Sequence, residues 1–95
     1  MMNEKLLEKK LREEVKKLGG LALKFTSQTY TGMPDRIVLM PGRRTYWAET
    51  KTTGEKLSPI QKKAHKDLRA LGQMVAVLDS QITLTWFLEV LRDDL

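Results

Sequence analysis

GMPDRIVLMPGRRTYWAETK, residues 32–51, is the stretch that decides how the rest of the chain is arranged. Its apolar run, residues 36–40, and its return run, residues 44–51, stand on either side of a Pro-Gly pair. Runs rich in β-branched and aromatic residues around such a turn are typical of a β-hairpin. We therefore predict a hairpin closed by a three-residue loop, residues 41–43.

The register of this hairpin brings charged side chains together. With a three-residue loop, Met40 faces Arg44 and Asp35 lies opposite Glu49. Because side chains alternate along a strand, Glu49 and Lys51 share one face, and Asp35 joins them there. Opposed residues sit about 4.5–5.5 Å apart at Cβ, so the two carboxylates repel unless a cation lies between them. Hard oxygen ligands at this spacing suit Mg²⁺, and Mn²⁺ is expected to substitute for it.

Each part of this pattern also has an ordinary explanation. An aspartate after a proline is a common turn residue, and a Glu-x-Lys pair on a strand is usually a solvated surface pair. The prediction of a metal site depends on the combination, in which an acid begins one strand while an acid and a lysine end its partner.

Composition limits the classes of protein to which the chain can belong. Its 95 residues correspond to one domain, residues 1–95. The absence of cysteine excludes disulfides and thiolate metal sites, and a single histidine excludes a multi-histidine zinc site within one chain. A net charge of +5 favours a polyanionic partner, although such a charge is also common in proteins that bind nothing acidic.

Hydropathy gives no indication of a membrane segment. No apolar run approaches the ~20 residues that a spanning helix needs, and the first residues lack the apolar core of a signal peptide. We therefore expect no membrane association and a cytoplasmic location.

An amphipathic helix is predicted over residues 3–18, ended by Gly19-Gly20. Its apolar stripe consists of Leu7, Leu11, Val15 and Leu18. Glu8 lies at the edge of this stripe, about 20° from Val15 at ~100° per residue, and Glu4 lies close to the same line. A carboxylate facing the core is costly unless it is paired or metal-bound. The alternative is that Glu8 reaches solvent from the stripe's edge or pairs with a lysine.

The segments that flank the hairpin contain a strand, loops and a capped helix. Residues 21–27 are predicted to form a strand, and residues 28–33 and 52–57 to form polar loops. Ser58-Pro59 is typical of a helix start, and this helix ends at Gly72. Its predicted core face is Ile60, Ala64, Leu68 and Leu71, bordered by Gln61 and His65.

A buried strand over residues 73–79 and a last helix from Ser80 to about residue 92 complete the chain. The last helix has two apolar stripes, Leu84, Phe87, Leu88 and Leu91 on one side and Ile82, Trp86 and Val90 on the other. A small domain can bury one stripe against its own sheet but hardly both. The second stripe therefore predicts a homodimer.

The predicted order of elements is α-β-β-β-α-β-α. Three antiparallel strands followed by a crossover helix and a further strand give an α/β fold, with helices packed on a mixed sheet. This order, with these residues, resembles the PD-(D/E)xK nuclease superfamily and its restriction-endonuclease-like core. The resemblance is greatest to the small stand-alone VRR-NUC domains, many of them found in phages. It covers nearly the whole chain, in the segments LALKF (21–25), GMPDR (32–36), ETK (49–51), SPIQ (58–61), His65 and LRALG (68–72).

The resemblance implies metal-dependent hydrolysis of phosphodiester bonds in DNA, in the cytoplasm of a host if the protein is phage-encoded. Asp35 and Glu49 would hold Mg²⁺, with the main-chain carbonyl of Thr50. Archaeal Holliday-junction resolvases are similar in less detail and carry an acid in the first helix, where Glu8 fits better than Glu4.

The resemblance also assigns roles around the metal. Lys51 would orient the attacking water or neutralise charge on the phosphate, and Gln61 would position Lys51 or the phosphate. The expected contacts to the DNA backbone are Lys24, Arg36, Arg43, Arg44, Lys56, Lys62 and His65. Thr50, Thr52 and Thr53 depart from the apolar or proline residues of many relatives, which leaves the conformation of this loop open.

Alternatives remain at both the residue and the protein level. Gln61 is equally well explained as a capping residue, and His65 as a helix-surface residue. We expect a structure-selective endonuclease that acts on branched DNA such as Holliday junctions, without a small-molecule cofactor. A non-catalytic DNA-binding module with the same fold is the alternative, and a basic interaction protein would explain the charge but not the acids.

Overall fold

The β2–β3 hairpin is the centre of the computed structural model, which describes residues 2–95. Strand β2 (Arg36–Met40) pairs antiparallel with β3 (Arg44–Thr50), with Met40 opposite Arg44 and Arg36 opposite Ala48. If this register is continued by one residue beyond the Arg36–Ala48 pair, Asp35 lies opposite Glu49, as the sequence predicts. The loop closes through Gly42 at φ 79° and Arg43 at φ 64°.

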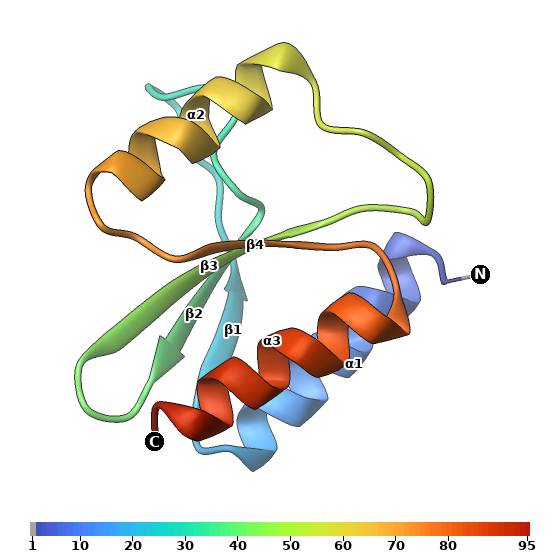
Figure 1. The fold of residues 1–95 in the computed structure, drawn as a ribbon, viewed down its shortest axis with the longest axis vertical. Coiled ribbons are helices and arrows are strands. Elements are labelled where there is room, and N and C mark those ends of the chain that lie inside the picture. Colours follow the sequence, from blue (N-terminus) through green and yellow to red (C-terminus); the bar gives the residue numbers. More distant parts are fainter. Residues whose placement is uncertain (1) are drawn as a thin grey trace.

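The remaining elements extend the hairpin into a four-stranded mixed sheet of order β1-β2-β3-β4. They are α1 (Glu4–Lys17), β1 (Leu21–Lys24), α2 (Pro59–Ala70), β4 (Val75–Leu78) and α3 (Gln81–Asp93). Strand β1 is antiparallel to β2, whereas β4 runs parallel to β3 after the α2 crossover (Figure 1). The predicted order α-β-β-β-α-β-α is confirmed.

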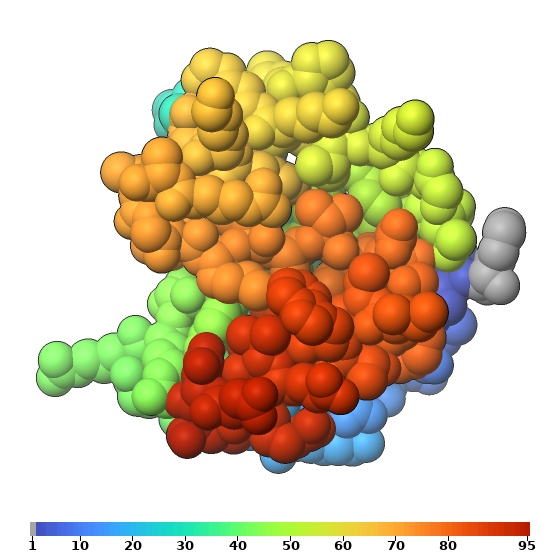
Figure 2. All heavy atoms as spheres, viewed as in Figure 1, coloured from blue at the N-terminus to red at the C-terminus, as the bar shows by residue number. Residues whose placement is uncertain are grey.

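Helices α1 and α3 lie side by side on one face of the sheet, and α2 lies on the other (Figure 1). The apolar core fills the first of these layers, where Val38, Tyr46 and Ala48 meet the predicted stripes of α1 and α3. In the space-filling view the tip of the hairpin projects beyond the helical layers (Figure 2). None of the helices within residues 2–95 is long and apolar enough to cross a membrane.

Helix α2 buries a different face from the predicted one. Ile60 is 50% exposed and Leu71 is 78% exposed, whereas Ala64 and His65 are buried. The sheet surface below α2 carries Glu49, whose carboxylate lies 3.5 Å from the His65 ring. An imidazole is a better neighbour for a carboxylate than an alkyl chain, so the helix turns its polar edge inward.

Strand β1 is shorter than predicted, because it ends at Lys24 instead of residue 27. The backbone N–H of Phe25 still donates to the carbonyl of Asp35, at 2.9 Å, and the chain then leaves the sheet. In consequence residues 26–33 form a loop over the open end of the hairpin and become available to line a cleft. Strand β4 is likewise limited to Val75–Leu78 within the predicted residues 73–79.

Candidate active site

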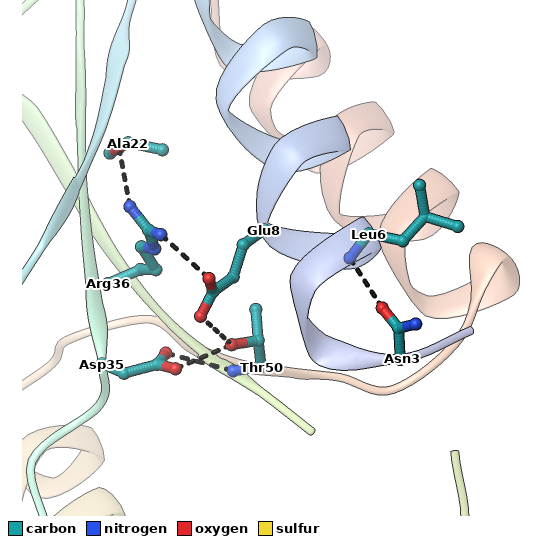
Figure 3. Close-up of polar contacts among 7 residues, drawn as sticks. All are labelled: Asn3, Leu6, Glu8, Ala22, Asp35, Arg36 and Thr50. Atoms are coloured by element: carbon teal, nitrogen blue, oxygen red, sulfur yellow. Dashed lines mark hydrogen bonds and ion pairs between the residues drawn. The ribbon is translucent and has the colours of Figure 1, made fainter. Parts of the chain in front are cut away.

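Asp35 lies at the open end of the hairpin, and Thr50 holds both of its carboxylate oxygens (Figure 3). The backbone N–H of Thr50 donates to Oδ1 at 3.1 Å, and its hydroxyl donates to Oδ2 at 2.7 Å. Burial raises the pKa of Asp35, while the two bonds from Thr50 act in the opposite direction. These bonds fix the orientation of the carboxylate and leave a second lone pair on each oxygen.

Glu49 is the most perturbed acid of the site. Its residue is 5% exposed, and burial, followed by the charge of Asp35, raises the pKa of the carboxyl to about 7. Its Oε1 is buried without a hydrogen-bond partner within the described part of the chain. A buried acid with a free oxygen and a strongly raised pKa is typical of a functional site.

Lys51 completes the predicted trio. It is 9% exposed, and its backbone N–H donates to the carbonyl of Leu78 at 2.8 Å, which anchors the end of β3 against β4. Its positive charge lowers the pKa of Glu49, against the effects of burial and Asp35. The ammonium is therefore within electrostatic reach of Glu49.

Glu8 reaches this site from α1, at the stripe edge where the sequence places it. Its Oε1 lies 3.4 Å from the hydroxyl of Thr50, and its Oε2 lies 3.4 Å from Nη2 of Arg36 (Figure 3). Glu4, one turn earlier, has a different environment, because burial and then the Glu55 carboxyl raise its pKa. Glu8 is thus the α1 acid that contacts Thr50.

Arg36 does not have the surface position expected of a DNA contact. It is 3% exposed, and its guanidinium bonds the carbonyl of Ala22 and pairs with Glu8. The expectation that it touches the DNA backbone is wrong for this arrangement. A buried guanidinium needs a carboxylate partner, and Glu8 is the acid that α1 presents to it.

His65 also differs from the sequence-based expectation, which made it a contact to the DNA backbone. Its side chain is fully buried, with Nε2 3.5 Å from Oε1 of Glu49, so it is not a backbone contact on the helix surface. Burial lowers the pKa of His65, and the charges of Arg69 and Lys51 add to the effect. The imidazole at this position is therefore neutral.

Gln61 both caps α2 and faces the site. Its side chain accepts the backbone N–H of Ser58 at 2.9 Å, while its own backbone N–H donates to the Ser58 hydroxyl at 3.3 Å. It also lines an open cleft of about 330 Å³ with Asp35 and Glu49. The rest of the lining comes from the loop after β1, at Phe25, Thr26, Ser27, Tyr30, Thr31, Gly32 and Met33.

The other predicted DNA contacts are exposed but are not gathered in one place. They are Lys24, Arg43, Arg44, Lys56 and Lys62. Arg43 and Arg44 lie at the closed end of the hairpin, opposite the end that carries the acids. Their exposure leaves them available to a polyanion, and the contact itself remains a prediction.

Sequence reasoning missed the side chain of Thr50, having considered only its carbonyl. Strand alternation contains the missing signal, because Thr50 falls on the same face as Ala48 and Tyr46, toward α1 and Glu8. The pairing of His65 with Glu49 had no such signal, since it depends on how α2 is rotated over the sheet.

The donor set fits a hard divalent cation that keeps part of its water shell. Within residues 2–95, no three His, Cys, Asp or Glu side chains form a group that could hold a metal ion by themselves. Mg²⁺ commonly binds through one or two carboxylates and retains several waters. Asp35 and Glu49, which line the same cleft, provide such a pair.

Comparison with known proteins agrees with this geometry. No family model matches the chain. The chain is 46% identical over 81 residues to "Putative nuclease p44" of Acyrthosiphon pisum secondary endosymbiont phage 1, which covers 85% of this chain and 87% of that protein. A solved "VRR_NUC domain" superposes with a TM-score of 0.85 at 28% identity, over 94% of this chain and 97% of its own. With the fold, the hairpin register and both comparisons in agreement, the chain belongs to the VRR-NUC family of nucleases.

Proposed function

We propose that this protein is a metal-dependent endonuclease that hydrolyses phosphodiester bonds in DNA, with Mg²⁺ as its cofactor and Mn²⁺ as a substitute. The observation that carries the proposal is the opposed Asp35–Glu49 pair, in which Glu49 is buried and Asp35 half-buried, with the buried Lys51 two residues after Glu49. Holding two like charges together away from solvent is unfavourable, and a protein that only binds DNA gains nothing from it. The non-catalytic binding module is therefore the weaker alternative.

Asp35 and Glu49 would hold the cation together with the main-chain carbonyl of Thr50, and Glu8 would contribute directly or through water. A bound divalent cation supplies Lewis-acid stabilisation of the phosphoryl oxygen and lowers the pKa of a bound water. Lys51 orients the attacking water or neutralises charge that develops on the phosphate. Attack of water on phosphorus breaks one P–O ester bond, and the leaving oxygen takes up a proton.

Gln61 would position Lys51 or the phosphate, and its position on the first turn of α2, lining the cleft, supports this role. The exposed basic residues named above would contact the DNA backbone, which sets register without reading sequence. The hydroxyls of Thr26, Ser27 and Thr31 in the cleft wall are further donors for phosphate oxygens.

Branched DNA, such as a Holliday junction, is the proposed substrate class, cut by a homodimer. On α3, Ile82 is 81% exposed and Trp86 is 49% exposed, and Val90 is half-buried beside them. Two-fold pairing of such a stripe is the commonest way to bury it. Two active sites related by a dyad suit a junction, whose opposed strands need two symmetric cuts.

The test is incubation of labelled junction, flap and linear duplex DNA with the protein in Mg²⁺, Mn²⁺ or EDTA. Cleavage should require a divalent cation, and Asp35→Asn or Glu49→Gln should reduce the rate by about a thousandfold or more, since each removes a charged group from the pair. Glu13→Gln is the control, because Glu13 is an exposed acid on α1 whose side chain is 55% accessible.

Cleavage undiminished in EDTA would exclude the metal mechanism. Metal-independent DNA binding without cleavage, unchanged in Asp35→Asn and Glu49→Gln, would instead identify a binding module. A rate on linear duplex equal to that on junctions would remove the substrate preference while leaving the chemistry in place.

A further inference from the structure

The Glu49–His65 pair is a buried polar contact that the proposed mechanism does not use. His65 is fully buried, and neither Nδ1 nor Nε2 has a hydrogen-bond partner within the described residues. Oε1 of Glu49 is likewise buried and unbonded, and it lies 3.5 Å from Nε2. Unpaired buried polar atoms are uncommon and unfavourable, so two of them facing each other call for an explanation.

The two ring nitrogens decide what His65 can give to Glu49. A neutral imidazole carries one N–H, on either nitrogen. Nε2 is the nitrogen that lies opposite Oε1 of Glu49. With a proton on Nε2, this nitrogen becomes a donor and Oε1 becomes its acceptor.

We propose that His65 is the positioning residue for Glu49, donating an Nε2–H hydrogen bond to Oε1 and so leaving Oε2 for the cleft. The present distance of 3.5 Å is longer than an ordinary N–H···O bond of about 3 Å. Such contacts in active sites often tighten only when the ligand binds. The bond would shorten when a cation binds Glu49.

Helix α2 is well suited to hold this donor in place. The Ser58–Gln61 capping box fixes its start, and Gly32 packs so closely on its first turn that a Cβ there would lie 2.5 Å from the carbonyl of Ile60. His65 follows one turn after Gln61, on the inward face with Ala64. The position of the helix thus sets the orientation of a carboxylate on a neighbouring strand.

This role rests on the proposed metal-dependent function, because it concerns the orientation of a metal-binding carboxylate. Hydrogen bonds to ligating side chains orient them, and their loss typically weakens metal binding about 10–100-fold. His65 would therefore act through Glu49, without touching the phosphate.

The test compares two variants by Mn²⁺ affinity, measured from the electron paramagnetic resonance signal of free Mn²⁺. His65→Phe keeps the ring volume and removes the donor, and should weaken Mn²⁺ binding about 10–100-fold. His65→Gln places an amide N–H near the position of Nε2 and should regain most of the lost affinity. Lys66→Gln, on the exposed side of α2, is the control and should bind as wild type does.

A second measurement needs no variant, because the chain has a single histidine. Nitrogen-15 spectra of the imidazole should show a neutral ring protonated at Nε2, with that proton protected from exchange when Mg²⁺ is present. A proton on Nδ1, or Mn²⁺ affinity equal in His65→Phe and wild type, would overturn the assignment. An Nε2 bound directly to the metal would also overturn it.

The outcomes separate this inference from the proposed function. If wild-type protein binds no Mn²⁺ and cuts no DNA, the proposed function fails, whatever His65 does. If wild type binds Mn²⁺ and cleaves while His65→Phe does both equally well, only the positioning role is lost.

Discussion

At the residue scale, the site is a set of acids whose environments differ although their chemistry is the same. Asp35 is held by two bonds from Thr50, Glu8 by Thr50 and Arg36, and Glu49 has an unbonded oxygen. The strongest perturbation among these acids falls on Glu49, because burial and the charge of Asp35 raise its pKa by more than the charge of Lys51 lowers it. A cation bound at the site would remove that penalty.

The raised pKa of Glu49 predicts how metal-free stability depends on pH. Between its ordinary value of 4.5 and about 7, folded Glu49 holds a proton that unfolded Glu49 has lost, so the free energy of unfolding falls as pH rises through this window. Glu49→Gln has no carboxyl at this position, so its free energy of unfolding should not fall for this reason. In EDTA it should be more stable than wild type by about 1–3 kcal/mol near pH 8 and nearly equal to it near pH 4.

Denaturant unfolding at a series of pH values measures this difference. Burial of His65 has the opposite effect on the pH dependence of stability, because its lowered pKa makes stability fall as pH drops below 6.5. This contribution is common to wild type and Glu49→Gln, so the difference between the two proteins removes it. If the free energy of unfolding varied with pH in the same way in wild type and Glu49→Gln, Glu49 would have an ordinary pKa in the folded protein.

The contacts of Glu8 predict that removal of its charge lowers activity. Glu8→Gln should lower the cleavage rate about tenfold or more relative to Glu13→Gln, because only Glu8 contacts Thr50 and Arg36. Rates measured at saturating Mg²⁺ and at limiting Mg²⁺ would separate lost metal affinity from lost turnover. Equal, small effects at both positions would make Glu8 only the partner of a buried arginine.

At the element scale, α2 is attached to the rest of the molecule by few buried side chains and one close backbone approach. Gly32, at φ 89°, lies against the carbonyl of Ile60 in the first turn of the helix. The helix contributes no side chain to the main apolar core. Its position therefore depends on the cap, on this glycine and on the pair that His65 makes with Glu49.

Gly32→Ala should consequently cost about 1–3 kcal/mol in stability through backbone strain, and more through the clash with Ile60. It should also lower activity, because it displaces Gln61 and His65 together. Gly72→Ala is the matched control, since Gly72 has φ 82° but open space at its Cβ position. Thermal unfolding and cleavage rates measure both effects, and equal losses in the two variants would exclude a role for the close approach.

At the scale of the whole molecule, assembly follows from the outer stripe of α3. The protein should sediment as a dimer of its 10.9 kDa chain at micromolar concentration, and Trp86→Glu should convert it to a monomer that no longer makes paired cuts in a junction. Leu71→Glu, which alters a side chain 78% exposed at the C-cap of α2, is the control and should remain dimeric. A wild-type monomer, or a dimer untouched by Trp86→Glu, would place the stripe outside any interface.

Much of the fold followed from local patterns. The Pro-Gly turn set the hairpin register, the Ser58-Pro59 and Ser80 caps began two helices, and the stripe of α1 matched its buried face. These features depend on neighbours along the chain, which is why they can be predicted from sequence. The antiparallel arrangement of the first three strands followed as well, because short connections leave few topologies, whereas the pairing of β4 with β3 was not predicted.

The sequence by itself predicted that Asp35 would lie opposite Glu49, because two-residue alternation and a three-residue loop set that register. Only the tertiary structure decided that Arg36 and His65 are buried and that Thr50 links Asp35 to Glu8. Those contacts depend on how α1 and α2 are rotated over the sheet. Their rotation results from packing across the whole molecule, which residue spacing along one segment does not contain.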